Sequence, residues 1–208
     1  MQRPTATRRQ FLALAGATGT TVLAGCDGDS DRTPTEEPTE TTTPDTLTNP
    51  SFESGLDDWT IGRDLPDDPN NPGQPVDSTV AVTDRVASDG SQALACTIDG
   101  SADDGTVWVE QRADLSGLTE ITVAGYSAQE SFNTIAKLAV YAGPDHDRDL
   151  TESDFDTSRA TEDHESWKDY SYAVDHDGPG LVAVGISVVW ETTVTRVLDQ
   201  IRLGSSGH

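Results

Sequence analysis

Basic residues are scarce in this 208-residue chain, which has 13 of them against 37 acidic residues. Only two of the basic residues, Lys137 and Lys168, are lysines. The formal net charge of −24 argues against a nucleic acid as partner, because the phosphate backbone is bound through Lys and Arg. A surface this acidic repels itself unless counter-ions screen it, and at molar salt the screening length falls to about 3 Å. We therefore interpret the charge as an adaptation to salt.

Long apolar runs and catalytic motifs are also missing. After residue 25 no segment is apolar enough to cross a membrane. The sequence contains no Gly-x-Ser-x-Gly, no His-Glu-x-x-His and no glycine-rich phosphate loop. His164 and His176 have acidic neighbours, but both are expected in surface turns. We therefore expect that the protein is not an enzyme, and a small secreted hydrolase is the disfavoured alternative.

The first 26 residues follow the order of a secretory signal, with arginines, a short apolar stretch and small residues before Cys26. Residues 7–12 (Thr-Arg-Arg-Gln-Phe-Leu) resemble the twin-arginine export motif, and residues 23–26 (Leu-Ala-Gly-Cys) resemble a lipobox. This implies a signal peptide at 1–25 and a lipid-modified Cys26 on the outer face of the cell membrane. An uncleaved anchor is disfavoured, because a span needs about 20 apolar residues.

Removal of the signal would leave 10 basic and 37 acidic side chains, a difference of −27. With the export route, this composition resembles the secreted proteins of extremely halophilic archaea. Lipidation of Cys26 would leave Cys96 as the single free cysteine, which excludes an intramolecular disulfide and a cysteine-based metal site. Cys96 shares strand parity with Leu94 and Ile98, so we expect a buried core residue rather than a reactive thiol.

Composition divides the mature chain into a tether and one domain. Residues 26–46 comprise Cys26 and a Thr/Pro/Glu-rich segment that has no apolar residue to order it and would span roughly 25 Å. In residues 47–208 the apolar residues recur with period two, as Val107 and Val109 do, between turn-like clusters such as 88–91. Many short strands predict an all-β fold, an antiparallel β-sandwich of jelly-roll type.

Five segments, in order along the domain, resemble jelly-roll carbohydrate-binding modules of the galactose-binding-like superfamily. Residues 49–53 (Asn-Pro-Ser-Phe-Glu), followed by Trp59, are similar to that family's opening "N-x-x-F-E … W". The other four segments are its glycine turn with a small-Leu pair (88–94), its "Q-x-v-D-L-S" strand (109–116), its "W-x-x-Y-S" segment (167–171) and its closing "I-D-D-V-x-L" strand (197–203). The resemblance implies the fold, but this fold also serves many roles that do not involve sugars.

The resemblance also implies a structural Ca²⁺ ion where the opening segment, the glycine turn and the last strand meet. Its ligands would be the side chains of Glu53, Asp89 and Asp199 with the carbonyl groups of Ser51 and Gln92. Such a set suits Ca²⁺, which takes six to eight hard oxygen ligands. The alternative is that these are ordinary acids of an acid-rich surface, although Asp199 interrupts an apolar run. The acids of 145–156 have an EF-hand-like spacing but no glycine at the sixth position, so a solvated loop is expected there.

Large aromatic residues on the polar faces of predicted strands indicate a ligand-binding face, because sugars stack on rings while nearby polar groups bind their hydroxyls. The candidate residues are Trp108, Tyr126, Tyr141, Glu110, Arg112 and Lys137. The alternative is that a loop or the edge of the chain covers one or more of these rings. Trp59 and Trp190 are expected in the core, and Trp167 is expected to be structural.

Together these features predict a lipid-anchored module that binds an extracellular carbohydrate or another envelope polymer without catalysis and touches the membrane only through its lipid. The alternative is a structural or adhesion protein that contacts surface-layer or other envelope proteins.

Overall fold

The computed structural model describes residues 46–102, 104–128, 136–161, 165–189 and 193–205. The signal peptide, Cys26, most of the tether and Trp190 lie outside the described residues. The described part forms nine strands and one short 3₁₀ helix, without an α-helix. These elements are β1 (Thr60–Asp64), β2 (Ser78–Thr83), β3 (Ala93–Ile98), β4 (Gly105–Asp114), β5 (Glu120–Ser127), β6 (Ala136–Gly143), η1 (Glu152–Asp154), β7 (Ser166–Ala173), β8 (Pro179–Val188) and β9 (Val194–Gly204). In this part of the chain, no helix has the length and apolar character that a membrane span needs.

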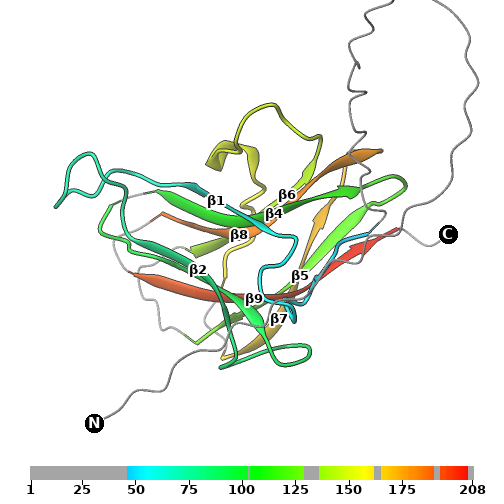
Figure 1. Cartoon of the computed structure of the whole chain (residues 1–208), viewed down its shortest axis with the longest axis horizontal. Coiled ribbons are helices and arrows are strands. Elements are labelled where there is room, and N and C mark those ends of the chain that lie inside the picture. Colours follow the sequence, from blue (N-terminus) through cyan, green and yellow to red (C-terminus); the bar gives the residue numbers. More distant parts are fainter. Residues whose placement is uncertain (1–45, 103, 129–135, 162–164, 190–192, 206–208) are drawn as a thin grey trace, which may run out of the picture. The chain divides into compact units, whose positions relative to one another are not determined.

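The strands form two antiparallel sheets that pack face to face (Figure 1). The four-stranded sheet has the order β1-β4-β8-β6, and the five-stranded sheet has the order β2-β3-β9-β5-β7. This arrangement confirms the predicted all-β fold, an antiparallel β-sandwich. Residues 156–161 run beside the outer edge of β6 and pair with it in part, since Val140 and Asp156 exchange backbone hydrogen bonds of 3.2 and 2.8 Å.

The core lies between the sheets and is filled by every second residue of the facing strands. Val107 and Val109 point into it from β4, and Leu94 and Cys96 point into it from β3. The buried position of Cys96 confirms the sequence-based expectation. Trp59 is also buried, as expected, and packs against Phe52 with ring centroids 5.5 Å apart. The residues between these positions point outward, and they decide what each outer face can bind.

Candidate functional site

The outer face of the four-stranded sheet carries five of the six predicted ligand-binding residues. Trp108, Glu110 and Arg112 alternate with the core residues of β4, while Lys137 and Tyr141 alternate with those of β6. The sixth residue, Tyr126, lies on β5 in the five-stranded sheet. The structure therefore does not bring the six residues together, and the prediction of one shared face is wrong. Strand parity separates the two sides of a strand but does not say which sheet the strand joins.

Trp108 is covered rather than open, with 1% of its surface exposed. Its indole lies over Gly62 of β1, where a Cβ atom would collide with the ring. The indole N–H donates a hydrogen bond of 2.6 Å to Glu110 Oε2. Phe155 packs on the ring with centroids 5.0 Å apart. The alternative in which a loop covers an aromatic ring is therefore the one found for Trp108.

The covering segment consists of residues 144–161. Its apolar residues Leu150 and Phe155 form a second hydrophobic cluster with Trp108 and nearby residues of β6 and β8. Inside the segment, Arg148 pairs with Asp154 at 2.7 Å, and this hydrogen-bonded ion pair holds the pKa of Asp154 well below its usual range. The expectation of a solvated loop at 145–156 is thus corrected: the four acids of the EF-hand-like spacing are exposed, but Leu150 and Phe155 are buried because they seal the sheet.

The 144–161 segment also holds the side chain of Tyr141 in place through hydrogen bonds. The Tyr141 hydroxyl donates to the Pro144 carbonyl at 2.6 Å and lies 2.9 Å from His146 Nε2. Burial, followed by the charge of Asp154, raises the pKa of Tyr141. Tyr141 is partly buried beside Phe155, with ring centroids 6.4 Å apart. Its ring therefore supports the 144–161 segment rather than forming an open platform.

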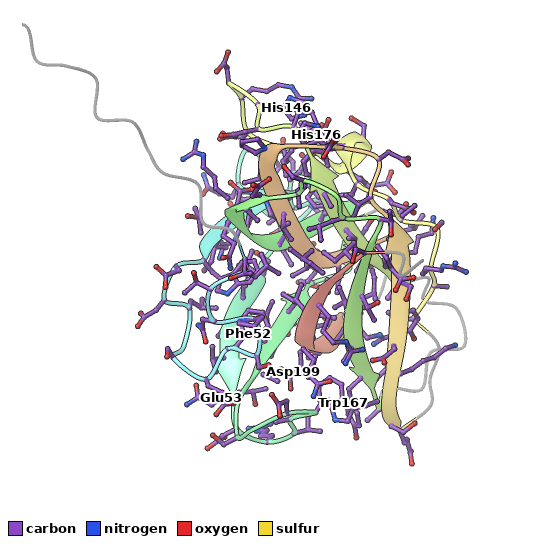
Figure 2. The ribbon with its side chains drawn as sticks, turned by 90° about the vertical axis from the view of Figure 1, so that its right-hand side faces the viewer. Phe52, Glu53, His146, Trp167, His176 and Asp199 are labelled. Atoms are coloured by element: carbon purple, nitrogen blue, oxygen red, sulfur yellow. The ribbon has the colours of Figure 1, made fainter. Side chains whose placement is uncertain are left out.

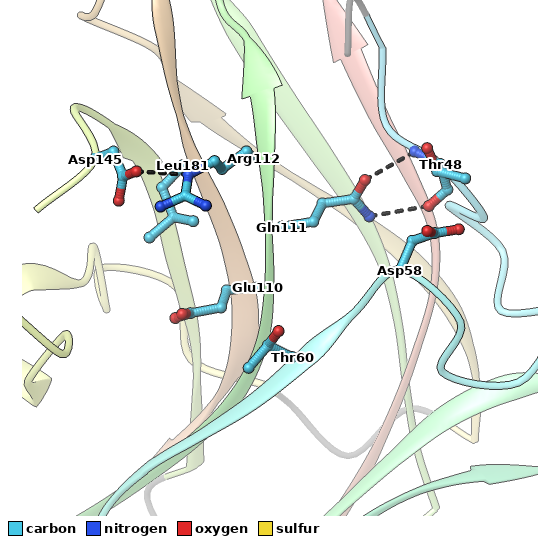
Figure 3. A pocket seen from close by; sticks show the side chains of 8 residues that line it. All are labelled: Thr48, Asp58, Thr60, Glu110, Gln111, Arg112, Asp145 and Leu181. Carbon is cyan, nitrogen blue, oxygen red and sulfur yellow. Dashed lines mark hydrogen bonds and ion pairs between the residues drawn. The ribbon is translucent and has the colours of Figure 1, made fainter. Parts of the chain in front are cut away.

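A pocket of 330 Å³ opens on the same face (Figure 3). It is lined by Thr48, Asp58, Thr60, Glu110, Gln111, Arg112, Asp145 and Leu181. Arg112 Nε donates a 2.7 Å hydrogen bond to Asp145 Oδ2, and both side chains are well exposed. Arg112 and Glu110 rise from the face itself, with Leu181 of β8 beside them (Figure 3). Hydrogen-bond donors, acceptors and an apolar side chain therefore meet in one open pocket.

The far wall of the pocket comes from the N-terminal segment. Gln111 Oε1 accepts the backbone N–H of Thr48 at 2.8 Å, and Gln111 Nε2 donates to the Thr48 carbonyl at 2.9 Å. This pairing fixes the segment that leads to Asp58 and Thr60. Sequence reasoning missed Thr48, Asp58, Thr60, Gln111, Asp145 and Leu181. The apolar residue Ile61, next to Thr60, weakly indicates the strand β1. No pattern in the sequence around Thr48 or Asp58 indicates that these residues lie beside β4.

The predicted calcium ligands gather at the turn formed by residues 88–92. Glu53 Oε1 accepts the backbone N–H groups of Ser91 and Gln92 at 2.8 and 2.7 Å. These bonds lower the pKa of Glu53. Gly90 adopts φ +63° against the Glu53 carboxylate, where a Cβ atom would collide with it. The turn is therefore held from one side by a carboxylate of the opening segment.

Asp199 of β9 holds the same turn from another side. Its Oδ2 atom accepts the backbone N–H groups of Ser88 and Asp89 at 2.7 and 3.0 Å. Asp199 is fully buried, and burial raises its pKa. Figure 2 shows Glu53 and Asp199 toward one end of the sandwich and His146 and His176 at the other.

Only part of a calcium site is formed by these groups. Glu53 and Asp199 use most of their oxygen atoms on backbone amides, and Ser51 Oγ donates to Asp89 Oδ2 at 3.3 Å. Within the described ranges, no three His, Cys, Asp or Glu side chains are arranged to hold a metal ion. In the same ranges, the buried charge of Asp199 has no Lys or Arg partner, and a cation would neutralise it. Calcium stays a prediction.

No family model and no curated protein matches this chain. Several solved structures are similar to it. A family 61 carbohydrate-binding module in complex with β-1,4-galactotriose is 17% identical, with 77% of this chain and 97% of that chain covered and a TM-score of 0.48. The xylan-binding CBM22-1 domain of Paenibacillus barcinonensis Xyn10C is 18% identical, with 76% and 93% covered and a TM-score of 0.45.

The enzymatically active domain of bacteriophage CBA120 tailspike protein 4 is 10% identical, with a TM-score of 0.51. The match covers 77% of this chain and 21% of the tailspike chain, so this chain corresponds to about a fifth of that protein. Similar solved structures thus include carbohydrate-binding modules, and likenesses at these identities concern the fold alone.

Proposed function

We propose that this chain is the glycan-binding module of an exported lipoprotein, and that it binds a carbohydrate in the pocket beside β4 without catalysis. The observation that carries the proposal is the combination of Arg112, Glu110 and Asp58 with Leu181 in one open pocket. The guanidinium group donates hydrogen bonds to sugar hydroxyls, and the carboxylates accept them. Leu181, which is 8% exposed, contributes the apolar part of the pocket lining.

The size and charge of the pocket narrow the ligand class. Its 330 Å³ falls within the range of about 300–1,000 Å³ that is usual for small-molecule sites, and suits one or two sugar units at the end or side of a chain. Three carboxylates and one guanidinium line it. A polyanionic glycan would be repelled by these groups and by the net charge of the chain. We therefore propose a neutral sugar.

The sequence supports the cellular part of the proposal. The twin-arginine-like segment and the lipobox-like segment support lipid modification of Cys26, and the tether of residues 26–46 would then hold the module away from the outer face of the membrane. The acidic composition supports an environment of high salt.

Removing one pocket residue tests the function. Arg112→Ala should weaken binding to a neutral polysaccharide at least about tenfold, the loss expected for a residue that dominates a binding site. The measurement is retardation in native gels that contain galactan, xylan or dextran, in molar NaCl. Arg202→Ala is the matched control, because Arg202 is also an exposed arginine in an ion pair, with Asp169 at 2.6 Å in the other sheet. Unchanged binding by Arg112→Ala would rule out the pocket.

We also propose that Ca²⁺ braces the 88–92 turn, with oxygens from Glu53, Asp89 and Asp199 and the carbonyls of Ser51 and Gln92. A bound cation would neutralise the buried Asp199 carboxylate. Chelated protein titrated with Ca²⁺ in high salt should release or absorb heat and gain thermal stability, whereas Asp199→Ala should gain none. A wild-type chain that shows neither heat nor a rise in Tm would remove calcium from the proposal.

A further inference from the structure

The outer face of the five-stranded sheet is crossed by two neighbouring rows of uncharged residues. The first row pairs one residue from each strand in turn, and its members are Ala81, Ala95, Val197, Tyr126 and Trp167. The second row is parallel to it, and its members are Thr79, Thr97 and Thr195. The residues that alternate with them along the strands, such as Cys96 and Leu198, fill the core, so both rows lie on the outer side of the sheet. Val197, in the middle of the first row, is only 8% exposed. We call these eight residues the neutral stripe.

Charged side chains border the neutral stripe on this side of the molecule, and the exposed Glu165 lies two residues before Trp167 in the sequence. Asp169 lies two residues after Trp167 on β7 and forms an exposed ion pair with Arg202 of β9 at 2.6 Å. Glu120 lies farther along β5. In a chain with 37 acidic residues, the outer face of a sheet is a natural place for them. The eight residues of the stripe itself, by contrast, carry no charge.

The chemistry of the stripe suits a sugar. Tyr126 and Trp167 form a direct cross-strand pair with ring centroids 5.5 Å apart and planes tilted by 48°, and both are partly exposed. Thr97 and Thr195 place their hydroxyls side by side at 2.8 Å, on the exposed side of β3 and β9. Ring faces stack on C–H groups, and threonine hydroxyls both donate and accept hydrogen bonds.

The dimensions of the stripe distinguish between a polymer chain and a protein partner. Four steps between strands, each of about 4.8 Å, make the first row roughly 19 Å long. Each of the eight residues occupies about 4.8 Å between strands and about 7 Å along its strand, so the stripe covers roughly 270 Å². This area is well below the roughly 800 Å² per partner of a stable protein interface. A slender extended chain that lies across the strands fits this surface.

From the register, the absence of charge and the dimensions, we propose that the neutral stripe binds one extended, uncharged polysaccharide chain. The stripe and the pocket beside β4 lie on opposite faces of the sandwich. This proposal shares its ligand class with the proposed function but uses none of the same residues. A module with both sites would hold two polymer chains at once.

The experiment measures retardation of the full chain in native gels with galactan, xylan or dextran, and with polygalacturonate as the anionic comparison. Trp167→Ala should raise the Kd for at least one neutral polymer about tenfold or more. Ala81→Asp should do the same, because it places a charge on the exposed end of the stripe and removes no packing. Asp169→Asn is the matched control on the same strand and face, one row away, and it should bind as the wild type does. Thermal denaturation confirms that each variant is folded.

Each outcome separates the two sites. If Trp167→Ala and Ala81→Asp bind as the wild type while Arg112→Ala loses all binding, the stripe is overturned and the pocket stands. If Trp167→Ala loses binding and Arg112→Ala does not, the stripe stands and the pocket falls.

Equal retardation by polygalacturonate overturns the choice of a neutral chain. A wild-type dimer in sedimentation that Trp167→Ala converts to a monomer, with polymer binding intact, would identify a protein interface instead. A wild type that no neutral polymer retards overturns both sites.

Discussion

Trp108 illustrates how single glycines shape the four-stranded sheet. Its neighbours across the strands are Gly62 on β1 and Gly185 on β8. A Cβ atom at Gly62 would collide with the indole ring, and one at Gly185 would collide with the backbone of β4. The ring therefore lies flat on the sheet, and the 144–161 segment closes over it.

We expect Gly62→Ala to lower the free energy of unfolding by about 1–3 kcal/mol, because the added methyl group overpacks the space that the indole fills. Urea denaturation measures the change. Gly204→Ala is the control, because the nearest atom to its Cβ would be 3.9 Å away. Equal stability of the wild type and Gly62→Ala would contradict the flat position of the ring.

Sequence reasoning was most successful for the side on which each residue lies. The alternation of Val107 and Val109 with Trp108 correctly separated core from outer face on β4. The same pattern could not show that Phe155, 47 positions later, covers Trp108. Periodicity is a local signal, whereas the cover depends on a contact between distant parts of the chain.

Among the elements, the 144–161 segment depends on one ion pair for its shape. Arg148 binds Asp154 through two hydrogen bonds of 2.8 and 2.7 Å, and the Thr151 N–H donates to the same carboxylate at 2.7 Å. These contacts flank η1. The η1 residue Glu152 accepts a 2.9 Å hydrogen bond from the hydroxyl group of Ser187 on β8, which joins η1 to the sheet. Protonation of Asp154 should therefore loosen the cover of the sheet.

The pH dependence follows from the lowered pKa of Asp154, whose largest cause is its hydrogen bond with Arg148. Because the folded-state pKa lies below the ordinary carboxyl value, the stabilisation is complete above that value and is lost as the pH falls below about 4. The free energy of unfolding of the wild type should exceed that of Asp154→Asn by about 1 kcal/mol at pH 7. The difference is this small because Arg148 is half exposed, so solvent screens the ion pair. Urea denaturation of both proteins from pH 7 to pH 3 should show this gap shrinking in acid; a constant gap would contradict the assignment.

β1 shows why one element was not predicted. Its sequence, Thr-Ile-Gly-Arg-Asp, contains a single large apolar residue, so period-two alternation is barely visible. The strand forms because β4 supplies a ladder of backbone partners from Thr106 to Glu110. This wall of the pocket was missed for the same reason, because Thr60 begins this strand and Asp58 lies two residues before it.

For the whole molecule, repulsion among the acidic side chains should lower the stability of the folded β-sandwich unless salt screens it. We expect the Tm to rise with NaCl, mostly between 0.1 and 1 M, because the screening length falls from about 10 Å to about 3 Å over that range. Each kcal/mol of repulsion removed should raise the Tm by about 2–4 °C. Differential scanning calorimetry measures the shift, and KCl at the same ionic strength should give a similar rise, because screening depends on ionic strength. A Tm that stays constant between 0.1 and 1 M of both salts would contradict the electrostatic origin.

The arrangement of the sheets could not be predicted from the sequence. Tyr126 and Trp108 both alternate with core residues, and both were assigned to one face, yet β5 and β4 belong to different sheets. Strand order depends on which distant strands pair, and short strands carry little information about their partners. The family-like motifs indicated the fold, whereas the opposite positions of the pocket and the neutral stripe emerged only from the register.

The pairing of Thr48 with Gln111 has a mechanical consequence for a chain held at its N-terminal side. Beyond the packing of Leu47 against the core, a pull from that side meets the two backbone groups of Thr48, which are bonded to the Gln111 side chain on β4. The next bond joins the Pro50 carbonyl to the Ile201 N–H of β9 at 3.0 Å. The load is thus shared between a central strand of each sheet, and an edge strand is not peeled away first. Tension from currents or from a bound polymer would therefore be carried by the most deeply paired strands of the molecule.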